Sequence, residues 1–229
     1  MSEWELRNQL PSCFLDYFHV LYTMIYDDPW DAVTEFEKEL AKYGGSQYAV
    51  CVDSCSNALF LCMKYLDVKD TVIELPARTY ASVPMQCIHA GNSIKFVNRV
   101  WSGCYRLFPT PIFDSACRFH RGMYVQDSYF CLSFHHRKTL NIGKGGAILT
   151  NDYEFVEWAR TMIYDGRHKY TKYDDDTLAC IGYHMYMTPE DADCGREILY
   201  ELSDTNPDTG DYTTYNDLRE QTVFNDYIK

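Results

Sequence analysis

Short apolar segments of two kinds alternate along this chain and restrict the folds that are open to it. Segments such as Tyr48–Val52 and Val72–Leu75 have the length and composition of buried strands. Between them lie longer segments, such as Asp31–Tyr43, in which apolar residues recur at helical spacing. Strands that alternate with helices stack in layers, with helices on the faces of a sheet. We therefore predict a three-layer α/β/α fold with a mostly parallel sheet.

The same criteria place the remaining elements. Further strands are expected at residues 94–97, 111–113, 129–134 and 147–150. Further helices are expected at residues 12–26, 54–66, 83–89, 154–163 and 189–202. From Ser203 onward the chain is rich in Asp, Thr, Asn and Tyr and has little apolar periodicity. We therefore expect one large domain over residues 1–202, with its N-terminal helices within residues 12–43, and a short tail over residues 203–229.

The composition narrows the function and the setting of the protein. A net charge of −12 argues against nucleic acid as a partner, because binding to phosphate backbones requires clustered Lys and Arg. The 10 cysteines form no CxxC pair and have no spacing typical of metal ligands, so we expect no metal site and a reducing cytoplasm. No segment is long and apolar enough to span a bilayer, so we expect no membrane association.

The run from Ser133 to Ala147 contains the strongest indication of chemistry. It places the Ser133 hydroxyl five residues before Lys138, and the pair Gly145-Gly146 precedes an apolar strand. The hydroxyl can bind a phosphate while the lysine amine reaches an aldehyde on the same small molecule. Pyridoxal 5'-phosphate (PLP) carries both groups. The alternative is a solvated loop cation, which is the commoner role of a lysine beside a glycine-rich turn.

Three other positions suit the same cofactor. Ser54-Cys55-Ser56 lies between a strand and a helix start, where free N–H groups favour a phosphate, although a plain helix cap is the commoner use. Asp114 ends an apolar strand, and a carboxylate buried there needs a cation, which the protonated pyridine nitrogen of PLP would supply. A carboxylate that caps a turn is the alternative. We expect Tyr80 to lie against the cofactor ring, with simple packing as its alternative role.

Several segments also match, in the same order, the motifs of a known enzyme family. They are Phe36–Leu40, Tyr48–Val50, Asp53–Leu59, Pro76–Ser82, Asp114–Ala116, Ser133–Lys138 with Gly145-Gly146, and Gly182–Glu190. The family forms of the last two are Ser-Phe-His-x-x-Lys with Gly-Gly, and Gly-Tyr-Asn-Tyr-Arg-Met-Ser-Pro-Glu. On these motifs the chain resembles the DegT/DnrJ/EryC1/StrS family of sugar aminotransferases, which are fold type I PLP enzymes.

The resemblance implies an aspartate aminotransferase-like fold and a role for each motif. Lys138 would hold PLP as a Schiff base and later move a proton between substrate and cofactor, and Asp114 would pair with the pyridinium. These two are the predicted catalytic residues. The predicted cofactor-binding residues are Cys55, Ser56, Tyr80, Asp114, Cys117, Ser133, Lys138, His184 and Tyr186.

The resemblance also implies a reaction and an assembly. An amino group would move from an amino acid donor such as glutamate to a keto-sugar nucleotide or a similar carbonyl compound. In the family the segment around His184 reaches the site of the neighbouring subunit, so His184 or Tyr186 is expected to complete that site across a homodimer.

The chain departs from the family pattern mainly by contraction. The stretch from Val97 to Asp114 is much shorter than its family counterpart, and little remains of the small C-terminal domain after residue 202. Cys117 stands where the family has Gln or His. Such contraction suggests a compact, viral form of the enzyme, in which residues 1–202 are the PLP-binding large domain and residues 203–229 are a remnant of the small domain.

Two other functions stay open at this point. One is a descendant without ordinary aminotransferase activity that keeps the fold as a PLP-binding or interaction module, which the contraction favours. The other is sugar dehydration, but that branch of the family carries His in place of the lysine, so Lys138 argues against it. Because Asp114, Ser133 and Lys138 are all present, we expect an aminotransferase.

Overall fold

A five-stranded sheet forms the centre of the computed structural model, which describes residues 28–169 and 171–229. Its strands, in spatial order, are β1 (Tyr48–Val52), β7 (Gly146–Thr150), β6 (Tyr129–Ser133), β5 (Ile112–Asp114) and β4 (Tyr105–Arg106). A second sheet pairs β2 (Val72–Pro76) with β3 (Ser93–Val97). The helix expected at residues 12–26 lies outside the described residues.

The expectation of a mostly parallel sheet is wrong. Strand β7 pairs antiparallel with both β1 and β6, and β4 pairs antiparallel with β5. Only β5 with β6 and β2 with β3 are parallel among the pairs of named strands. The reason is that residues 134–145 join β6 to β7 without a helix, and parallel neighbours require a crossover connection. Strands β1, β5 and β6 nevertheless run in one direction, so their carboxyl ends lie at the same edge.

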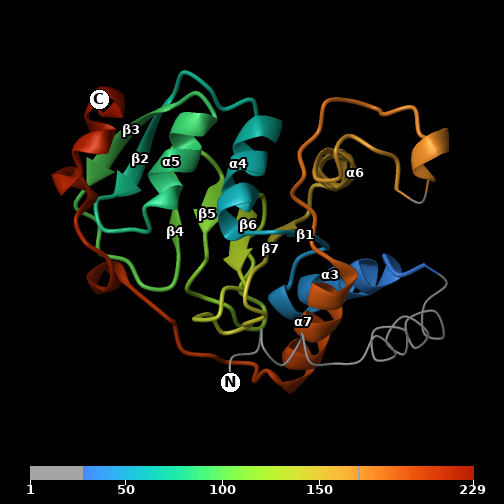
Figure 1. The fold of residues 1–229 in the computed structure, drawn as a ribbon. Helices are drawn as coiled ribbons and strands as arrows, with labels where there is room; N and C mark the ends of the chain where they lie inside the picture. Colours follow the sequence, from blue (N-terminus) through green and yellow to red (C-terminus); the bar gives the residue numbers. More distant parts are fainter. Residues whose placement is uncertain (1–27, 170) are drawn as a thin grey trace, which may run out of the picture.

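Helices cover both faces of the large sheet, as the predicted layering requires (Figure 1). Helices α4 (Cys55–Tyr65), α5 (Ser82–His89) and α6 (Tyr153–Met162) bury apolar residues in one core, and α3 (Asp31–Gly44) and α7 (Pro189–Glu201) bury theirs in another. Alternate residues of β1 enter the two cores, Val50 and Val52 on one side and Ala49 and Cys51 on the other. The α/β class of the prediction is therefore confirmed.

The expected strands and helices are all present in the described part of the chain, each within one residue of its expected bounds. Local capping explains some of this agreement. The Ser54 side chain accepts a hydrogen bond from the Asn57 amide at 3.2 Å and so begins α4, while Thr188 and Pro189 begin α7. Strand β4 was not expected, because a strand of two residues has no readable periodicity.

The tail over residues 203–229 folds back across the body of this chain. It contains short 3-10 helices, η2 (Tyr212–Thr214), η3 (Leu218–Glu220) and η4 (Thr222–Tyr227), and a further one, η1 (Tyr173–Asp175), precedes α7. Figure 1 shows the tail running from α7 to the side of β2 and β3. Leu218 and Phe224 are buried there, and the Lys229 amide donates to the Ile94 carbonyl at 3.0 Å. Within the described residues, no helix combines the length and apolarity needed to cross a membrane.

Candidate cofactor-binding site

A cavity of about 480 Å³ lies at the edge of the sheet where β1, β5 and β6 end. Seven of the nine predicted cofactor-binding residues line it, namely Cys55, Ser56, Tyr80, Asp114, Cys117, Ser133 and Lys138. Asp114 is the last residue of β5, Ser133 is the last residue of β6, and Cys55 opens the helix that follows β1. Strands that run in the same direction bring these three positions together, as in other layered α/β proteins.

Asp114 is a buried carboxylate whose contacting groups are neutral. The Tyr105 hydroxyl donates to its Oδ2 at 2.7 Å, the Ala116 amide donates to its Oδ1 at 3.0 Å, and the Cys55 thiol lies 3.9 Å from Oδ1. Burial raises the pKa of Asp114, and the hydrogen bond from Tyr105 opposes that rise. A carboxylate in these surroundings is stabilised by a cation placed beside it in the cavity.

Tyr105 is a functional residue that the sequence reasoning missed. Its hydroxyl contacts both Asp114 and the buried Thr79 hydroxyl. Burial, with the neighbouring Asp114 charge, raises the pKa of Tyr105 well above its ordinary value, so the phenol stays protonated and donates to the carboxylate. Its strand, β4, lies in the contracted stretch before Asp114, where no family motif had been identified.

Lys138 reaches the cavity from the loop between β6 and β7. Its amine donates to the Cys117 sulfur at 3.1 Å, and the Tyr215 hydroxyl lies 3.5 Å from the same sulfur. The hydrogen-bond partner of the amine is thus a thiol rather than a carboxylate. A lysine amine in such a position can react with a carbonyl carbon that enters the cavity.

The first turn of α4 provides N–H groups on the opposite wall of the cavity. The Ser56 hydroxyl lies 2.6 Å from the hydroxyl of Ser82, the first residue of α5. Both serines line the cavity. A Cβ added to Gly146 would lie 2.6 Å from the Cys55 amide nitrogen, so only glycine lets the helix start come this close to β7. A helix start with adjacent hydroxyls is a binding site for a phosphate. Ser82 was missed, although it lies within the motif segment Pro76–Ser82.

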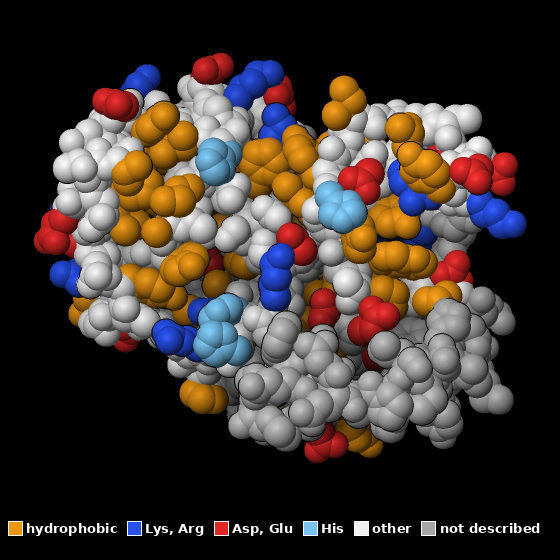
Figure 2. Space-filling model, viewed as in Figure 1, with side chains coloured by type: hydrophobic (Ala, Val, Ile, Leu, Met, Phe, Trp, Pro, Cys, Tyr) orange, Lys and Arg blue, Asp and Glu red, His pale blue; other side chains and the backbone are white. Residues whose placement is uncertain are grey.

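The rim of the cavity differs in character from its floor. Tyr80 lies there with 61% of its surface exposed, and its ring meets the edge of Tyr215 at a centroid distance of 6.4 Å. His135, Arg137 and Lys144 line the mouth. Figure 2 shows histidine and basic side chains together near the middle of the viewed face. Burial lowers the pKa of His135 and so favours its neutral form, and the Lys144 amine pairs with the Asp53 carboxylate at 3.7 Å. Of these three residues, Arg137 is therefore the cation that suits an anionic ligand.

The structure does not bring His184 and Tyr186 to this cavity. The His184 ring nitrogen Nδ1 lies 2.9 Å from the Asp165 carboxylate, and the Tyr186 ring packs edge-on against Trp30 and Tyr164, each at 5.2 Å. Tyr186 instead lines a separate cavity of about 230 Å³. The expected role of these two residues in a neighbouring subunit stays a prediction.

Known proteins resemble this chain in sequence and fold. The spore coat polysaccharide biosynthesis protein SpsC of Bacillus subtilis is 25% identical over an alignment that covers 75% of this chain and 57% of SpsC. The structure of AtS13 from Actinomadura melliaura has a TM-score of 0.67 and 20% identity, covering 82% of this chain and 64% of AtS13. The chain thus spans less than two thirds of the length of either protein.

A third similarity is to a DegT DnrJ EryC1 StrS aminotransferase from Brucella abortus, with a TM-score of 0.58 and 20% identity over 74% of this chain and 58% of that one. The model of the DegT/DnrJ/EryC1/StrS aminotransferase family matches residues 20–100 and 125–218, well over half of the sequence. Asp114 and Cys117 lie between the two matched ranges. On this match, the chain belongs to the DegT/DnrJ/EryC1/StrS aminotransferase family.

Proposed function

We propose that this chain is a PLP-dependent aminotransferase that moves an amino group from an amino acid donor, glutamate, to a keto-sugar nucleotide or a similar carbonyl compound. The observation that carries the proposal is the meeting of the Lys138 amine and the Asp114 carboxylate in one cavity with the start of α4. Family membership supports the reaction class. The donor and the acceptor follow from the family resemblance.

The groups that line the cavity fit PLP one by one. The buried Asp114 carboxylate suits a protonated pyridine nitrogen, because its other contacts are neutral. The first turn of α4, with the Ser56 and Ser133 hydroxyls, suits the phosphate. The Lys138 amine suits the aldehyde. We therefore propose the predicted residues Cys55, Ser56, Tyr80, Asp114, Cys117, Ser133 and Lys138 as the cofactor site, with Ser82 added.

When bound, PLP supplies an electron sink for the charge that develops on the substrate carbon. Asp114 would pair with the protonated pyridine nitrogen, and Tyr105 would hold the carboxylate in place through its hydrogen bond. The Lys138 amine would move a proton between the substrate carbon and the cofactor carbon, and the Cys117 sulfur, which accepts its hydrogen bond at 3.1 Å, would orient this amine.

Arg137 at the mouth supports an anionic acceptor such as a nucleotide-linked sugar, which the family resemblance implies. We further propose a cytoplasmic homodimer in which His184 and Tyr186 of one subunit contribute to the site of the other. Residues 1–202 would be the PLP-binding large domain, and residues 203–229 would take the place of the small domain.

The first test is an absorbance titration of the purified protein with PLP, with Lys138→Ala beside the wild type. We expect a band near the edge of the visible range that borohydride fixes to the wild type and that the variant lacks. Adding glutamate should then bleach the band. A protein that stays colourless with PLP refutes the cofactor assignment. A band that glutamate and other amino acids leave unchanged favours the alternative, a family descendant that binds PLP without transamination.

A further inference from the structure

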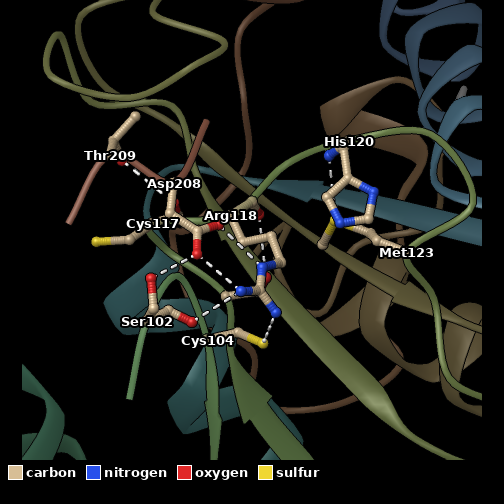
Figure 3. A network of polar contacts seen from close by, with 9 residues as sticks. Ser102, Cys104, Cys117, Arg118, His120, Met123, Asp208 and Thr209 are labelled. Carbon is tan, nitrogen blue, oxygen red and sulfur yellow. Dashed lines mark hydrogen bonds and ion pairs between the residues drawn. The ribbon is translucent and has the colours of Figure 1, made fainter. Parts of the chain in front are cut away.

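The tail is joined to the internal stretch, residues 101–124, that lies between the two ranges matched by the family model. Asp208 accepts hydrogen bonds from Arg118 at 2.9 and 2.7 Å and from the Ser102 hydroxyl at 2.7 Å, and Figure 3 shows it between these two residues. Arg118 and Ser102 both lie within residues 101–124, between the matched ranges. The side chain of Asp208 thus attaches the tail to this internal stretch.

Backbone hydrogen bonds continue this attachment along the tail. The Thr209 amide donates to the Cys117 carbonyl at 2.8 Å, and the Gly103 amide donates to the Gly210 carbonyl at 3.0 Å. The Tyr212 amide donates to the Trp101 carbonyl at 3.1 Å. Backbone pairing of this kind extends the side-chain attachment of Asp208 along the tail.

Three tail residues, Thr209, Thr214 and Tyr215, line the cofactor cavity itself. The Tyr215 ring stacks on Trp101 with centroids 5.9 Å apart, and its carbonyl accepts a hydrogen bond from Arg78 at 3.1 Å. Its hydroxyl reaches the Cys117 sulfur that holds the Lys138 amine. Tyr215 thus lies one residue away from the amine that reacts with substrate.

Both ends of this part of the tail are anchored. The two-point contact of Asp208 with Arg118 is partly buried, with 20% and 31% of the side chains exposed, and such pairs hold their geometry better than single exposed ones. Beyond Tyr215, the Leu218 amide donates to the Ala77 carbonyl at 2.8 Å and the Leu218 side chain is buried. A segment held at both ends behaves as a wall rather than as a free flap.

We propose that residues 208–215 are a permanent wall of the cavity and that Tyr215 limits the size of the carbonyl substrate that reaches Lys138. The second part rests on the proposed aminotransferase function. The wall lines the cavity with Thr209, Thr214 and Tyr215, and so keeps water and oversized carbonyl compounds away from the amine. Tyr215 acts here as a specificity-determining residue.

The wall is tested first without any cofactor, by the rate at which iodoacetamide alkylates Cys117 in the full-length protein. Cys117 is only 3% exposed behind Tyr215. Peptide mass spectrometry locates the modified cysteine. We expect Tyr215→Ala to speed alkylation of Cys117 several-fold, because it removes the covering ring. Tyr215→Phe should stay slow, since it keeps the ring and removes only the hydroxyl.

Tyr227→Ala is the matched control, because Tyr227 lies in the same tail, is 44% exposed and does not line the cavity. Its alkylation rate at Cys117 should equal that of the wild type. If Tyr215→Ala fails to fold, Asp208→Asn tests the same wall by releasing its anchor on Arg118, and faster alkylation is again expected. A wild-type rate in the variant that folds overturns the wall.

The size limit is tested with the pyridoxamine phosphate-loaded protein and two 2-oxo acids, pyruvate and phenylpyruvate. Tyr215→Ala should raise the rate with phenylpyruvate relative to pyruvate several-fold, and Tyr227→Ala should leave the ratio unchanged. An unchanged ratio in Tyr215→Ala overturns the size limit. Tighter binding of PLP by that variant would also overturn it, because Tyr215 would then block the cofactor site itself. If the wild type binds no PLP while the alkylation results hold, the proposed function fails and the wall stands.

Discussion

Replacing Tyr105 by Phe tests how this chain supports the buried charge of its cavity. The substitution removes one oxygen, which donates to Asp114 Oδ2 at 2.7 Å and also contacts the buried Thr79 hydroxyl. The aromatic ring stays in place, so its packing against Trp101 at a centroid distance of 4.9 Å is retained. Any loss of stability therefore comes from hydrogen bonding and not from a cavity.

The size of the loss follows from the kind of bond. A hydrogen bond to a charged group contributes about 1.5–3 kcal/mol to stability, and one between neutral groups about 1 kcal/mol. We therefore expect Tyr105→Phe to lower the free energy of unfolding by about 2–3 kcal/mol at neutral pH. In an Asp114→Asn background, where the acceptor is neutral, the same substitution should cost only about 1 kcal/mol.

The cost should also depend on pH. Burial raises the pKa of Asp114 above its unfolded value, so the folded protein holds this proton more tightly than the unfolded chain. The stability that comes from protonated Asp114 is fully present below the pKa of this carboxyl in the unfolded chain, and it is lost as pH rises through its pKa in the folded protein. Removing the Tyr105 donor raises the folded pKa further. The penalty of Tyr105→Phe is therefore largest at neutral pH and smaller in acid.

Urea unfolding followed by fluorescence measures these free energies at neutral pH and at the most acid pH at which the wild type stays folded. Tyr153→Phe is the matched control, because Tyr153 is 56% exposed, and we expect its stability to match the wild type. An equal cost of Tyr105→Phe with Asp114 and with Asn at that position would refute the claim that Tyr105 supports a buried carboxylate.

Three further outcomes are expected. Gly146→Ala should lower the free energy of unfolding by about 3 kcal/mol, because its Cβ would lie 2.6 Å from backbone atoms, and urea unfolding at wild-type concentrations would contradict this. Ser82→Ala should weaken PLP binding about fivefold in an absorbance titration, because it removes the hydrogen-bond partner of Ser56 and the loss of that bond costs about 1 kcal/mol. An unchanged dissociation constant would exclude Ser82 from the phosphate site. Arg118 lowers the pKa of Asp208, so the stability from this ion pair is present above the ordinary carboxyl pKa and is lost as pH falls through the lowered pKa of Asp208. The difference in stability between the wild type and Asp208→Asn should therefore shrink in acid. A difference that stays constant with pH in urea unfolding would disprove the ion pair's contribution.

The floor of the cavity was largely readable from the sequence. Asp114 ends a short apolar strand, and such an end is recognisable because the apolar run stops there. Ser133 was expected one residue before the end of its strand and is the last residue of β6. Lys138 follows at a spacing that allows it to serve the same small molecule. The bounds of the helices and strands were also predictable, because the buried residues of each element recur at a regular spacing that stops where the element ends.

Strand direction was not readable in this way. Periodicity shows that β6 and β7 are buried strands, but it does not show which way β7 runs. The short loop of residues 134–145 reverses the chain and makes β7 antiparallel to both of its neighbours. The separation in sequence between β1 and β7 also hides their pairing, which only the folded sheet decides.

The sequence by itself determined the local features on which the proposed cofactor chemistry rests, namely a lysine, a strand-end carboxylate and a helix start. Only the tertiary structure decided what surrounds that chemistry. Tyr105 lies in a strand too short to detect, and Tyr215 lies in a polar tail without apolar period. Asp208 meets Arg118 across 90 positions of sequence, and a contact of that range leaves no local pattern because each partner alone resembles an ordinary surface charge.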